Sequence, residues 1–477
     1  MIKIKFGTSG WRDIIAHNFT NQNVRVVTQS IADYVKSKSA PGTRPAVIIG
    51  YDTRFMSEDF AKVSACVLAA NGVIAVYCKR DTPTPVIAYE IIRNGYAGGI
   101  NFTASHNPFE YNGIKFSPSW GGPALPETTD AIENRCNEIL MNPQRIRETP
   151  WEEGRKKKLI KETNPQETFL KRIKELVDIK AIKKSRLKTG IDLLYGTAKG
   201  YLDELLFSAG LKPIILHNYR DVLFGGHRPE PDEERLQELK KIILEKGLHL
   251  GMACDGDADR FGILDSDGTY ITPNEVVSLA LYHLIKTRAW KGVVVRSVMT
   301  THFIDAIARR YGIEVRETPV GFKFIGEIMT NEPGSFIIGG EESGGLTIRG
   351  HVPEKDGILA CMLIAEMCSI EKKSIRRIIS DISKQVGHFI TKRINFSLTP
   401  EIIERLKTRL KDNPPTEFAN VKVKEIVTVD GSKFLLEDGS WVGMRLSGTE
   451  PVVRLYIETN TREKLSLLRG ASEKIIK

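Results

Sequence analysis

The sequence predicts an α/β protein of several domains, with parallel or mixed sheets covered by helices. Short apolar runs of strand length alternate with amphipathic helical stretches along most of the chain. The chain has 477 residues, which exceeds what one hydrophobic core supports and favours three or four domains. After about residue 385 the pattern becomes strand-rich, which predicts that the last domain is of the α+β kind.

A rhythm of strand, helix and strand occurs three times, in residues 47–77, 190–216 and 293–316. In the first unit, a helical stretch at 57–70 separates two short apolar strands, and the other units follow the same order. No fixed-period repeat accompanies this rhythm. Three similar α/β domains are therefore expected before the C-terminal one.

Domain boundaries are expected where the composition changes. Residues 142–164 are polar and highly charged, which indicates a connection between the first two domains. In the last part, strands are expected at 421–429, 433–437 and 452–458, followed by a helix from Arg462. The predicted domains are residues 1–155, 156–268, 269–385 and 386–477.

The composition argues against a membrane or nucleic-acid partner. Hydrophobic residues make up 41% of the chain, and no apolar run approaches the roughly 20 residues that cross a bilayer. The formal net charge is +10, but acidic and basic residues are interspersed along much of the chain. Residues 231–246 are an example. Such mixing is typical of solvated helix faces, and the interleaved aromatic and arginine residues of a base-stacking surface are absent. We therefore expect neither partner.

The cysteines and the N-terminal segment indicate a cytoplasmic protein. Residues 1–6 alternate like a strand and lack the basic and apolar regions of a secretory signal. Six cysteines are scattered without a CxxC pair, which predicts unpaired thiols that fill the core in a reducing compartment.

The first chemical candidate is Ser105, in the segment Thr-Ala-Ser-His-Asn-Pro that follows a glycine-rich strand at 98–102. A serine at the end of a strand is held by the strand while its hydroxyl faces an open loop. The alternative is a turn in which Asn107 and Pro108 supply the backbone geometry.

Three carboxylates alternate in a second loop, at Asp255, Asp257 and Asp259. The small residues between them allow all three to turn toward one centre, and oxygen ligands favour a hard cation such as Mg²⁺ over zinc. The alternatives are a calcium loop of the EF-hand type and a plain acidic turn. In an EF-hand, Arg260 would replace the glycine and Ser266 the bidentate glutamate, and in a turn without a ligand the three carboxylates would repel one another.

Two further loops combine glycine with polar side chains. In the first, Glu341 and Ser343 are flanked by glycines and suit sugar hydroxyls, while a flexible glycine-rich turn is the alternative. The second offers a guanidinium, two hydroxyls and exposed amides, which suit a phosphate, while a plain surface turn is the alternative. Its residues are Arg445, Ser447, Gly448 and Thr449.

These four motifs, with a fifth at residues 6–12, resemble in order and spacing the α-D-phosphohexomutase superfamily of phosphoglucomutases and phosphomannomutases. The resemblance spans the chain. It implies three similar α/β domains with mixed sheets and a smaller, mobile C-terminal α+β domain around a central cleft.

The resemblance also implies a role for each motif. Ser105 would be the phosphorylated serine, the three aspartates would hold magnesium with it, and Glu341 and Ser343 would contact the sugar. The loop at 445–449 would hold the phosphate that is not transferred. The residues expected near the transferring phosphoryl group are Arg12, His106, Lys115 and Arg260. Lys115 is the first choice for proton transfer, with an ordinary exposed lysine as the alternative.

Two segments resemble the glucose-type members, at residues 318–324, with Gly321 and Lys323, and at residues 351–357, with His351 and Lys355. Many bifunctional relatives carry a histidine soon after the Glu-x-Ser element, whereas this chain has Gly344 and Gly345. His351 is therefore either a proton carrier or a structural histidine.

The resemblance implies a reaction through a hexose bisphosphate. Phosphoserine would donate its phosphoryl group to a hexose monophosphate, and the bisphosphate would turn end for end before the other phosphate returns to Ser105. Glucose phosphate is favoured as the substrate, mannose and glucosamine phosphates are the alternatives, and a non-catalytic sugar-phosphate sensor is a further one. All of these require the serine and the three aspartates to meet in space.

Overall fold

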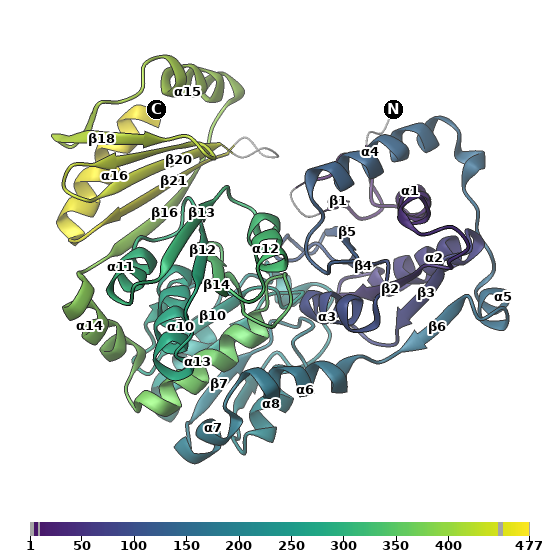
Figure 1. Ribbon diagram of the computed structural model, residues 1–477, viewed down its shortest axis with the longest axis horizontal. Coiled ribbons are helices and arrows are strands. Elements are labelled where there is room, and N and C mark those ends of the chain that lie inside the picture. Colours follow the sequence, from purple (N-terminus) through teal and green to yellow (C-terminus); the bar gives the residue numbers. More distant parts are fainter. Residues whose placement is uncertain (1–3, 8–9, 447–451, 477) are drawn as a thin grey trace.

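The computed structural model describes residues 4–7, 10–446 and 452–476 (Figure 1). Four sheets follow one another along the chain, and the first and the last lie at opposite ends of the molecule. Three sheets mix parallel and antiparallel pairs, whereas every pair in the fourth is antiparallel. The predicted fold class is thus confirmed.

Domain 1 holds a sheet of six strands in the order β1-β5-β4-β2-β3-β6. β5 runs antiparallel to both of its neighbours, while β2 pairs in parallel with β3 and β4. The elements are β1 (Trp11–Ile14), α1 (Asn21–Lys38), β2 (Ala46–Tyr51), α2 (Ser57–Ala70), β3 (Ile74–Cys78), α3 (Thr84–Asn94), β4 (Gly98–Phe102), β5 (Tyr111–Pro118), α4 (Pro126–Met141), α5 (Trp151–Lys156) and β6 (Ile160–Thr163).

Two expectations for this domain are wrong. The charged segment 142–164 is not a plain connection, because it contains α5 and β6, and β6 extends the sheet beside β3. Ile160, the first residue of β6, is buried in the domain core, so a boundary at residue 155 would cut a strand from its sheet. In addition, residues 4–6 form no strand, although Ile4 is buried, and residues 1–3 lie outside the described part.

Domain 2 holds a sheet in the order β11-β10-β9-β7-β8, in which β9 is parallel to β7 and antiparallel to β10. The elements are α6 (Gln166–Leu176), α7 (Ile179–Ser185), β7 (Thr189–Asp192), α8 (Leu202–Ser208), β8 (Ile214–Leu216), α9 (Gln237–Lys246), β9 (Leu250–Cys254), β10 (Phe261–Asp265) and β11 (Tyr270–Ile271).

Domain 3 holds a sheet in the order β13-β12-β14-β15. The elements are α10 (Pro273–Arg288), β12 (Val293–Ser297), α11 (Phe303–Arg310), β13 (Glu314–Thr318), α12 (Phe322–Asn331), β14 (Phe336–Glu341), β15 (Gly345–Ile348), α13 (Gly357–Glu371) and α14 (Ile375–Val386). A capping box between Thr272 and Glu275 starts α10, and the side chain of Asp356 caps α13.

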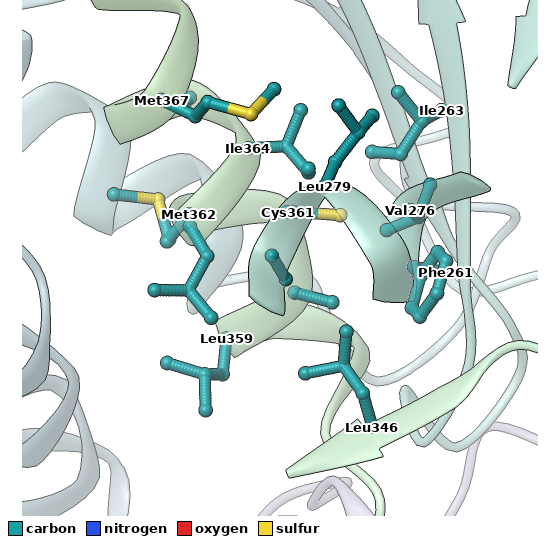
Figure 2. Packing of buried hydrophobic residues seen from close by; sticks show 14 of the residues in the cluster. Phe261, Ile263, Val276, Leu279, Leu346, Leu359, Cys361, Met362, Ile364 and Met367 are labelled. Carbon is teal, nitrogen blue, oxygen red and sulfur yellow. The ribbon is translucent and has the colours of Figure 1, made fainter. Parts of the chain in front are cut away.

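Domains 2 and 3 share one hydrophobic core (Figure 2). Helix α13 is apolar on all sides, and it packs against α7, α8, β9 and β10 of domain 2 as well as α10 and β15 of its own domain. Figure 2 shows Phe261 and Ile263 of domain 2 in one cluster with Val276 and Leu346 of domain 3. A helix that is hydrophobic all round must be buried on both faces, which explains its place between two sheets.

Domain 4 holds an antiparallel sheet in the order β16-β21-β20-β19-β18-β17, with a core of its own. The elements are β16 (Ile390–Ser397), α15 (Pro400–Asp412), β17 (Glu417–Phe418), β18 (Val421–Val427), β19 (Ser432–Leu436), β20 (Trp441–Leu446), β21 (Val452–Thr459) and α16 (Arg462–Ile476). The structure therefore adds β16, β17, α15 and β20 to the strands and helix expected here.

The six cysteines are buried and unpaired, as expected of core residues. Within the described ranges, no helix combines the length and the apolar character needed to cross a bilayer.

Candidate active site

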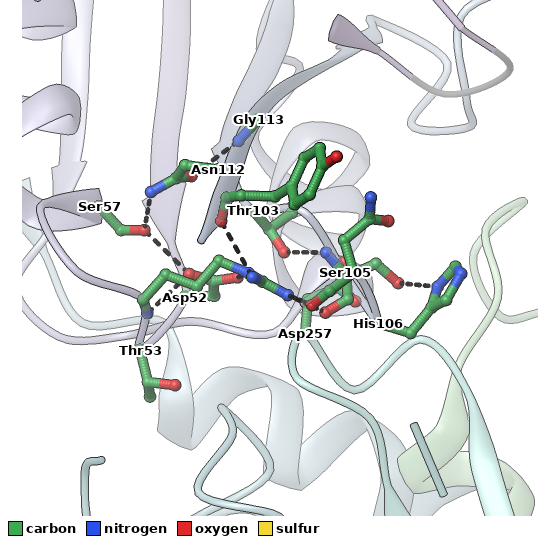
Figure 3. A network of polar contacts seen from close by, with 12 residues as sticks. Asp52, Thr53, Ser57, Thr103, Ser105, His106, Asn112, Gly113 and Asp257 are labelled. Carbon is green, nitrogen blue, oxygen red and sulfur yellow. Dashed lines mark hydrogen bonds and ion pairs between the residues drawn. The ribbon is translucent and has the colours of Figure 1, made fainter. Parts of the chain in front are cut away.

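The serine loop lies between β4 and β5, and Figure 3 shows the polar contacts around it. Ser105 is buried and has a φ of 52°, a left-handed conformation that is uncommon for a residue with a side chain. Its amide donates to the hydroxyl of Thr103 at 2.8 Å. Its hydroxyl donates to Oδ2 of Asp255 at 2.8 Å. The structure thus brings the serine of domain 1 to the acidic loop of domain 2.

The acidic loop joins β9 to β10, and its three carboxylates are buried. Asp255, Asp257 and Asp259 each offer one oxygen within 4.8 Å of the others. Ala258 adopts a left-handed conformation, with φ of 57°, between the second and third aspartates. The Oδ1 atoms of Asp257 and Asp259 are buried without a hydrogen-bond partner. Buried carboxylate oxygens without partners are costly, so this donor set fits a hard cation.

The surroundings shift the pKa values of the three carboxyl groups in different directions. Burial, together with repulsion from the other two carboxylates, raises the pKa of Asp255 well above its ordinary value. Burial also opposes ionisation of Asp257 and Asp259, but their neighbours together outweigh it and lower the pKa of both. Lys115 acts on both groups, Thr84 also acts on Asp257, and Lys355 and Arg260 also act on Asp259. The centre therefore combines carboxylates that remain ionised with one that resists ionisation until a cation compensates it.

Two lysines approach the acidic loop from different domains. Nζ of Lys115, on β5, lies 2.6 Å from Asp257 and 3.0 Å from Asp259, and the residue is buried, so the exposed alternative for this lysine is wrong. Nζ of Lys355, in domain 3, lies 3.2 Å from Asp259 and 2.9 Å from Glu354. Burial opposes the charge of Lys115, but the two aspartates raise its pKa, so it is an ammonium group here.

Two arginines complete the cationic surroundings. The amide of Arg260 donates to Asp255 at 3.0 Å, and its guanidinium binds Glu230 at 2.8 Å. The guanidinium of Arg12 donates to Oδ1 of Asn107 at 2.9 Å, two residues after the serine. Cations on several sides of one serine and three carboxylates suit a group whose charge becomes spread over phosphoryl oxygens.

His106 lies beside the serine, with Nδ1 at 3.3 Å from Oγ of Ser105. Burial and the neighbouring Arg260 and Arg12 lower its pKa well below the ordinary value, so the ring is neutral at pH 7. A neutral imidazole at this distance can exchange a hydrogen bond with the serine without adding charge to the site.

The loop with Glu341 closes the site from domain 3. Oε1 of Glu341 accepts from the amide of Gly321 at 2.7 Å, which joins the two segments expected to contact the sugar. Burial and the adjacent Glu342 raise the pKa of Glu341 to about 7. A Cβ atom on Gly345 would lie 2.2 Å from Cδ of Lys355, so the lysine stem occupies the space beside this glycine. Ser343 lines a cavity of about 350 Å³ between domains 2, 3 and 4.

Several of the expected residues lie apart from the carboxylates. The side chain of His351 is fully buried, and its Nε2 lies 2.7 Å from Asp356, so its geometry favours the structural alternative. Nζ of Lys323 lies over the ring of Phe324 at 5.3 Å. Arg445 binds Asp430 at 2.9 Å, at the edge of domain 4. Ser447, Gly448 and Thr449 lie outside the described residues.

The sequence analysis missed residues that hold the loops in place. Thr84 donates to Oδ2 of Asp257 at 2.5 Å and accepts from Asn101 at 2.7 Å. Asp52 and Arg54 are buried behind the serine loop. A signal was available for this pair, because β2 ends immediately before Asp52 and side chains that follow neighbouring parallel strands meet at one edge of a sheet.

A buried serine held against convergent carboxylates, on a chain of three α/β domains and one antiparallel domain, defines a class of multidomain phosphotransferases. Family models described as phosphoglucomutase/phosphomannomutase match in four parts: domain I at residues 3–142, domain II at 167–268, domain III at 272–386 and the C-terminal domain at 404–472. The chain therefore belongs to the phosphoglucomutase/phosphomannomutase family, whose members are intramolecular phosphotransferases within the α-D-phosphohexomutase superfamily.

Individual relatives are similar over their whole length. A phosphoglucomutase/phosphomannomutase of Thermococcus kodakarensis is 31% identical over 96% of this chain and 95% of its own. A protein of Methanothermobacter thermautotrophicus that is described as a phosphoglucosamine mutase is 30% identical over 99% of this chain and 98% of its own. A crystal structure from Thermus thermophilus, described as a phosphomannomutase, superposes with a TM-score of 0.85 at 28% identity and covers 100% of this chain and 99% of its own. The resemblance found from the sequence is confirmed.

Proposed function

We propose that this protein interconverts hexose 1-phosphate and hexose 6-phosphate through phosphorylated Ser105 and a hexose 1,6-bisphosphate, with glucose phosphate as the preferred substrate. The observation that carries the proposal is the 2.8 Å hydrogen bond between the Ser105 hydroxyl and Asp255. It joins a nucleophile on domain 1 to the acidic loop of domain 2, as phosphoryl transfer at a metal centre requires.

In the first half of the reaction, the bond between phosphorus and Oγ of Ser105 breaks while a bond forms to the free hydroxyl of the sugar. Arg12 and Arg260 stabilise the charge on the transferring oxygens, and neutral His106 donates to the Ser105 oxygen as it leaves. Lys115 is the proposed proton acceptor for the sugar hydroxyl. This role requires its neutral form, which a cation held by Asp257 and Asp259 would favour by offsetting the charges that raise the pKa of Lys115. The second half runs in reverse with the other phosphate, after the bisphosphate has turned within the site.

We propose Mg²⁺ as the metal, held by Asp255, Asp257, Asp259 and the phosphorylated Ser105. The two buried aspartate oxygens without partners support this assignment, because oxygen ligands suit a hard cation. When bound, Mg²⁺ would offset the negative charge of the phosphoryl oxygens and of the carboxylates that raise the pKa of Lys115.

The sugar would lie against the loop of domain 3 that carries Glu341 and Ser343. Glucose and mannose differ only at the 2-position, so contacts to the 3- and 4-hydroxyls do not separate them. We favour glucose because Gly321 and Lys355, from the two glucose-type segments, surround Glu341 and Gly345. The relatives are described as phosphoglucomutases, phosphomannomutases or phosphoglucosamine mutases, so mannose and glucosamine phosphates are the alternative substrates.

The phosphate that is not transferred would lie at the loop 445–449 of domain 4. Arg454 stands directly opposite Arg445 on the neighbouring strand, which adds a second guanidinium beside this loop. Two guanidinium groups on the same face of a sheet can each donate a pair of hydrogen bonds to a phosphate dianion. His351 is proposed only as a structural residue, because its ring is buried against Asp356.

We also propose that the enzyme acts in the cytoplasm. Six buried cysteines without a disulfide support this location, since thiols persist in a reducing compartment.

The test is a coupled assay that converts glucose 1-phosphate to glucose 6-phosphate, with the mannose and glucosamine phosphates in parallel. Ser105→Ala is expected to lower kcat by roughly 10³-fold or more, because the nucleophile is lost. Ser119→Ala, at an exposed serine of the same domain, is the matched control. Intact mass after incubation with the hexose bisphosphate should show one added phosphoryl group in the wild type and none in Ser105→Ala. Sugar-phosphate binding without turnover in the wild type would favour a sensor instead.

A further inference from the structure

Arg54 contacts the backbone of the serine loop with its guanidinium group. It is fully buried. Its Nε donates to Asp52 at 3.1 Å. Its Nη1 and Nη2 atoms donate to four main-chain carbonyls at 2.7, 3.0, 2.7 and 2.7 Å, which belong to Pro108, Tyr111, Ser105 and Asn107.

These contacts use all five N–H donors of the guanidinium. No donor is left for a phosphoryl oxygen, so Arg54 acts on the reaction through the loop. The rigid planar fork also explains the residue type, since a lysine has three donors on one atom and cannot span the same carbonyls.

The loop that Arg54 holds is under backbone strain. Ser105 has a left-handed φ of 52°, a conformation that is unfavourable for a residue with a side chain. Such a conformation persists only where its surroundings determine it. Here Arg54 binds the Ser105 carbonyl on one side, and Thr103 binds the Ser105 amide on the other.

The same arginine lies at the junction with domain 2. Its guanidinium stands over the ring of Phe224 at 5.1 Å, and Arg220 donates to the carbonyls of Thr53 and Arg54. On the side of the acidic loop, a Cβ atom on Gly256 would lie 2.9 Å from the Ser105 carbonyl oxygen. The carbonyl that Arg54 orients therefore also packs directly against the loop of the three aspartates.

We propose that Arg54, held by Asp52, is a positioning residue that fixes the strained loop so that the Ser105 oxygen meets the aspartates and the substrate phosphate. This inference rests on the proposed phosphoryl transfer at Ser105. It assigns the pair a role in kcat and none in substrate binding, because Asp52 and the loop carbonyls use every donor of Arg54.

Arg54→Lys is the first test, and Arg349→Lys is its matched control. Arg349 also donates to main-chain carbonyls and lies over an aromatic ring, Trp290, at 5.0 Å, but in domain 3. Arg54→Lys is expected to lower kcat about 10²-fold, with KM changed less than about threefold, because a displacement of the nucleophile near 1 Å costs this much. Arg349→Lys should keep both values.

A second readout does not depend on turnover. Hydrogen exchange of the amides in residues 103–111 should become faster in Arg54→Lys and not in Arg349→Lys. If the wild type shows no mutase activity, the proposed function fails, and this exchange measurement still decides whether Arg54 holds the loop.

Asp52→Asn is the second test, and it replaces the first if Arg54→Lys does not fold. Asparagine has nearly the same shape as aspartate. The variant should lower kcat about 3- to 10-fold and raise exchange in the same loop, because the anion that fixes Nε is lost. Unchanged exchange in both variants would overturn the proposal. So would faster exchange with wild-type kcat, or a loss that appears in KM alone.

Discussion

The two junctions of domain 3 differ in kind. Toward domain 2, helix α13 is buried between the two domains, and one continuous core extends across the boundary (Figure 2). Toward domain 4, a small apolar cluster around Met299 and Trp441 lies beside several polar contacts. The domain 2–3 unit is therefore one packed body, whereas domain 4 is attached through a limited surface.

Individual polar contacts carry much of the second junction. Lys433 of domain 4 is buried, and its Nζ donates to the carbonyl of Val298 at 2.7 Å and contacts Nε2 of His302 at 2.8 Å. Tyr456 donates to Glu342 at 3.3 Å, and the amide of Val320 donates to Asp430 at 3.1 Å.

The difference matters for the proposed reaction. The acidic loop and the loop of Glu341 belong to the packed body, so their relative position is fixed by a core that resists deformation. The loop proposed to bind the second phosphate belongs to domain 4, whose junction with domain 3 includes discrete polar contacts that can break and form again. In the proposed reaction, metal and sugar would thus be held rigidly, while domain 4, which would bind the distal phosphate, could move during reorientation.

The largest effect is expected from breaking the shared core. Ile364→Ala, at a fully buried position of α13, should lower the free energy of unfolding by about 2–5 kcal/mol, because a cavity replaces buried methyl groups. Ile370→Ala, at the exposed end of the same helix, should cost less than about 1 kcal/mol. Denaturant unfolding followed by hydrogen exchange measures both.

In Ile364→Ala, residues 250–265 and 336–348 should lose protection together if domains 2 and 3 form one unit. Loss in only one of these segments would contradict the comparison.

A smaller, pH-dependent effect is expected at the junction between domains 3 and 4. Burial and the nearby Arg296 lower the pKa of Lys433 to about 8. The folded protein then releases this proton near pH 8, whereas the unfolded chain keeps it until near its ordinary value of 10.5. Between these pH values the unfolded state binds more protons, so the stability of the docked domain 4 should rise with pH, by up to about 3 kcal/mol.

Lys433→Met should remove this rise, whereas Lys464→Met, at a half-buried lysine of the same domain that pairs with Asp438, should keep it. Denaturant titrations between pH 7.5 and 10.5, followed by tryptophan fluorescence, provide the measurement. Parallel curves for the wild type and Lys433→Met would show that this lysine does not titrate in the window.

The smallest effect is expected from Tyr456→Phe, which removes one hydrogen bond across the same junction. Glu342 keeps its contact with Ser297 at 2.8 Å, so the loss should be about 0.5–1 kcal/mol in the docking of domain 4. The unfolding of the domain 2–3 body should stay the same. An equal loss in both transitions would mean that the two junctions are not independent.

Local patterns predicted the elements whose signals are continuous in the chain. Helix α2 spans residues 57–70 in both the prediction and the structure, and strand β18 begins at the predicted residue 421. The alternate carboxylates were also readable, because three ligands within five residues need no distant partner. In contrast, β20 was missed because Gly443 and Arg445 interrupt its apolar run.

What the sequence did not show depends on contacts between distant residues. Nothing local indicates that α13 completes the core of the preceding domain or that β6 returns to the first sheet. His351 belongs to a segment that resembles the sugar-contacting one, yet its ring lies in a buried pair with Asp356. Arg54 was overlooked because its partners are backbone carbonyls some fifty residues further on, which leave no mark in side-chain patterns.

The position of α13 also has a consequence for biosynthesis. During translation, β9 and β10 emerge from the ribosome before α13 does, so their apolar face stays uncovered until all strands of the third sheet have been made. Nascent chains that end before residue 357 should therefore expose this face and depend on chaperones, and the acidic loop would take its final shape only after α13 is synthesised.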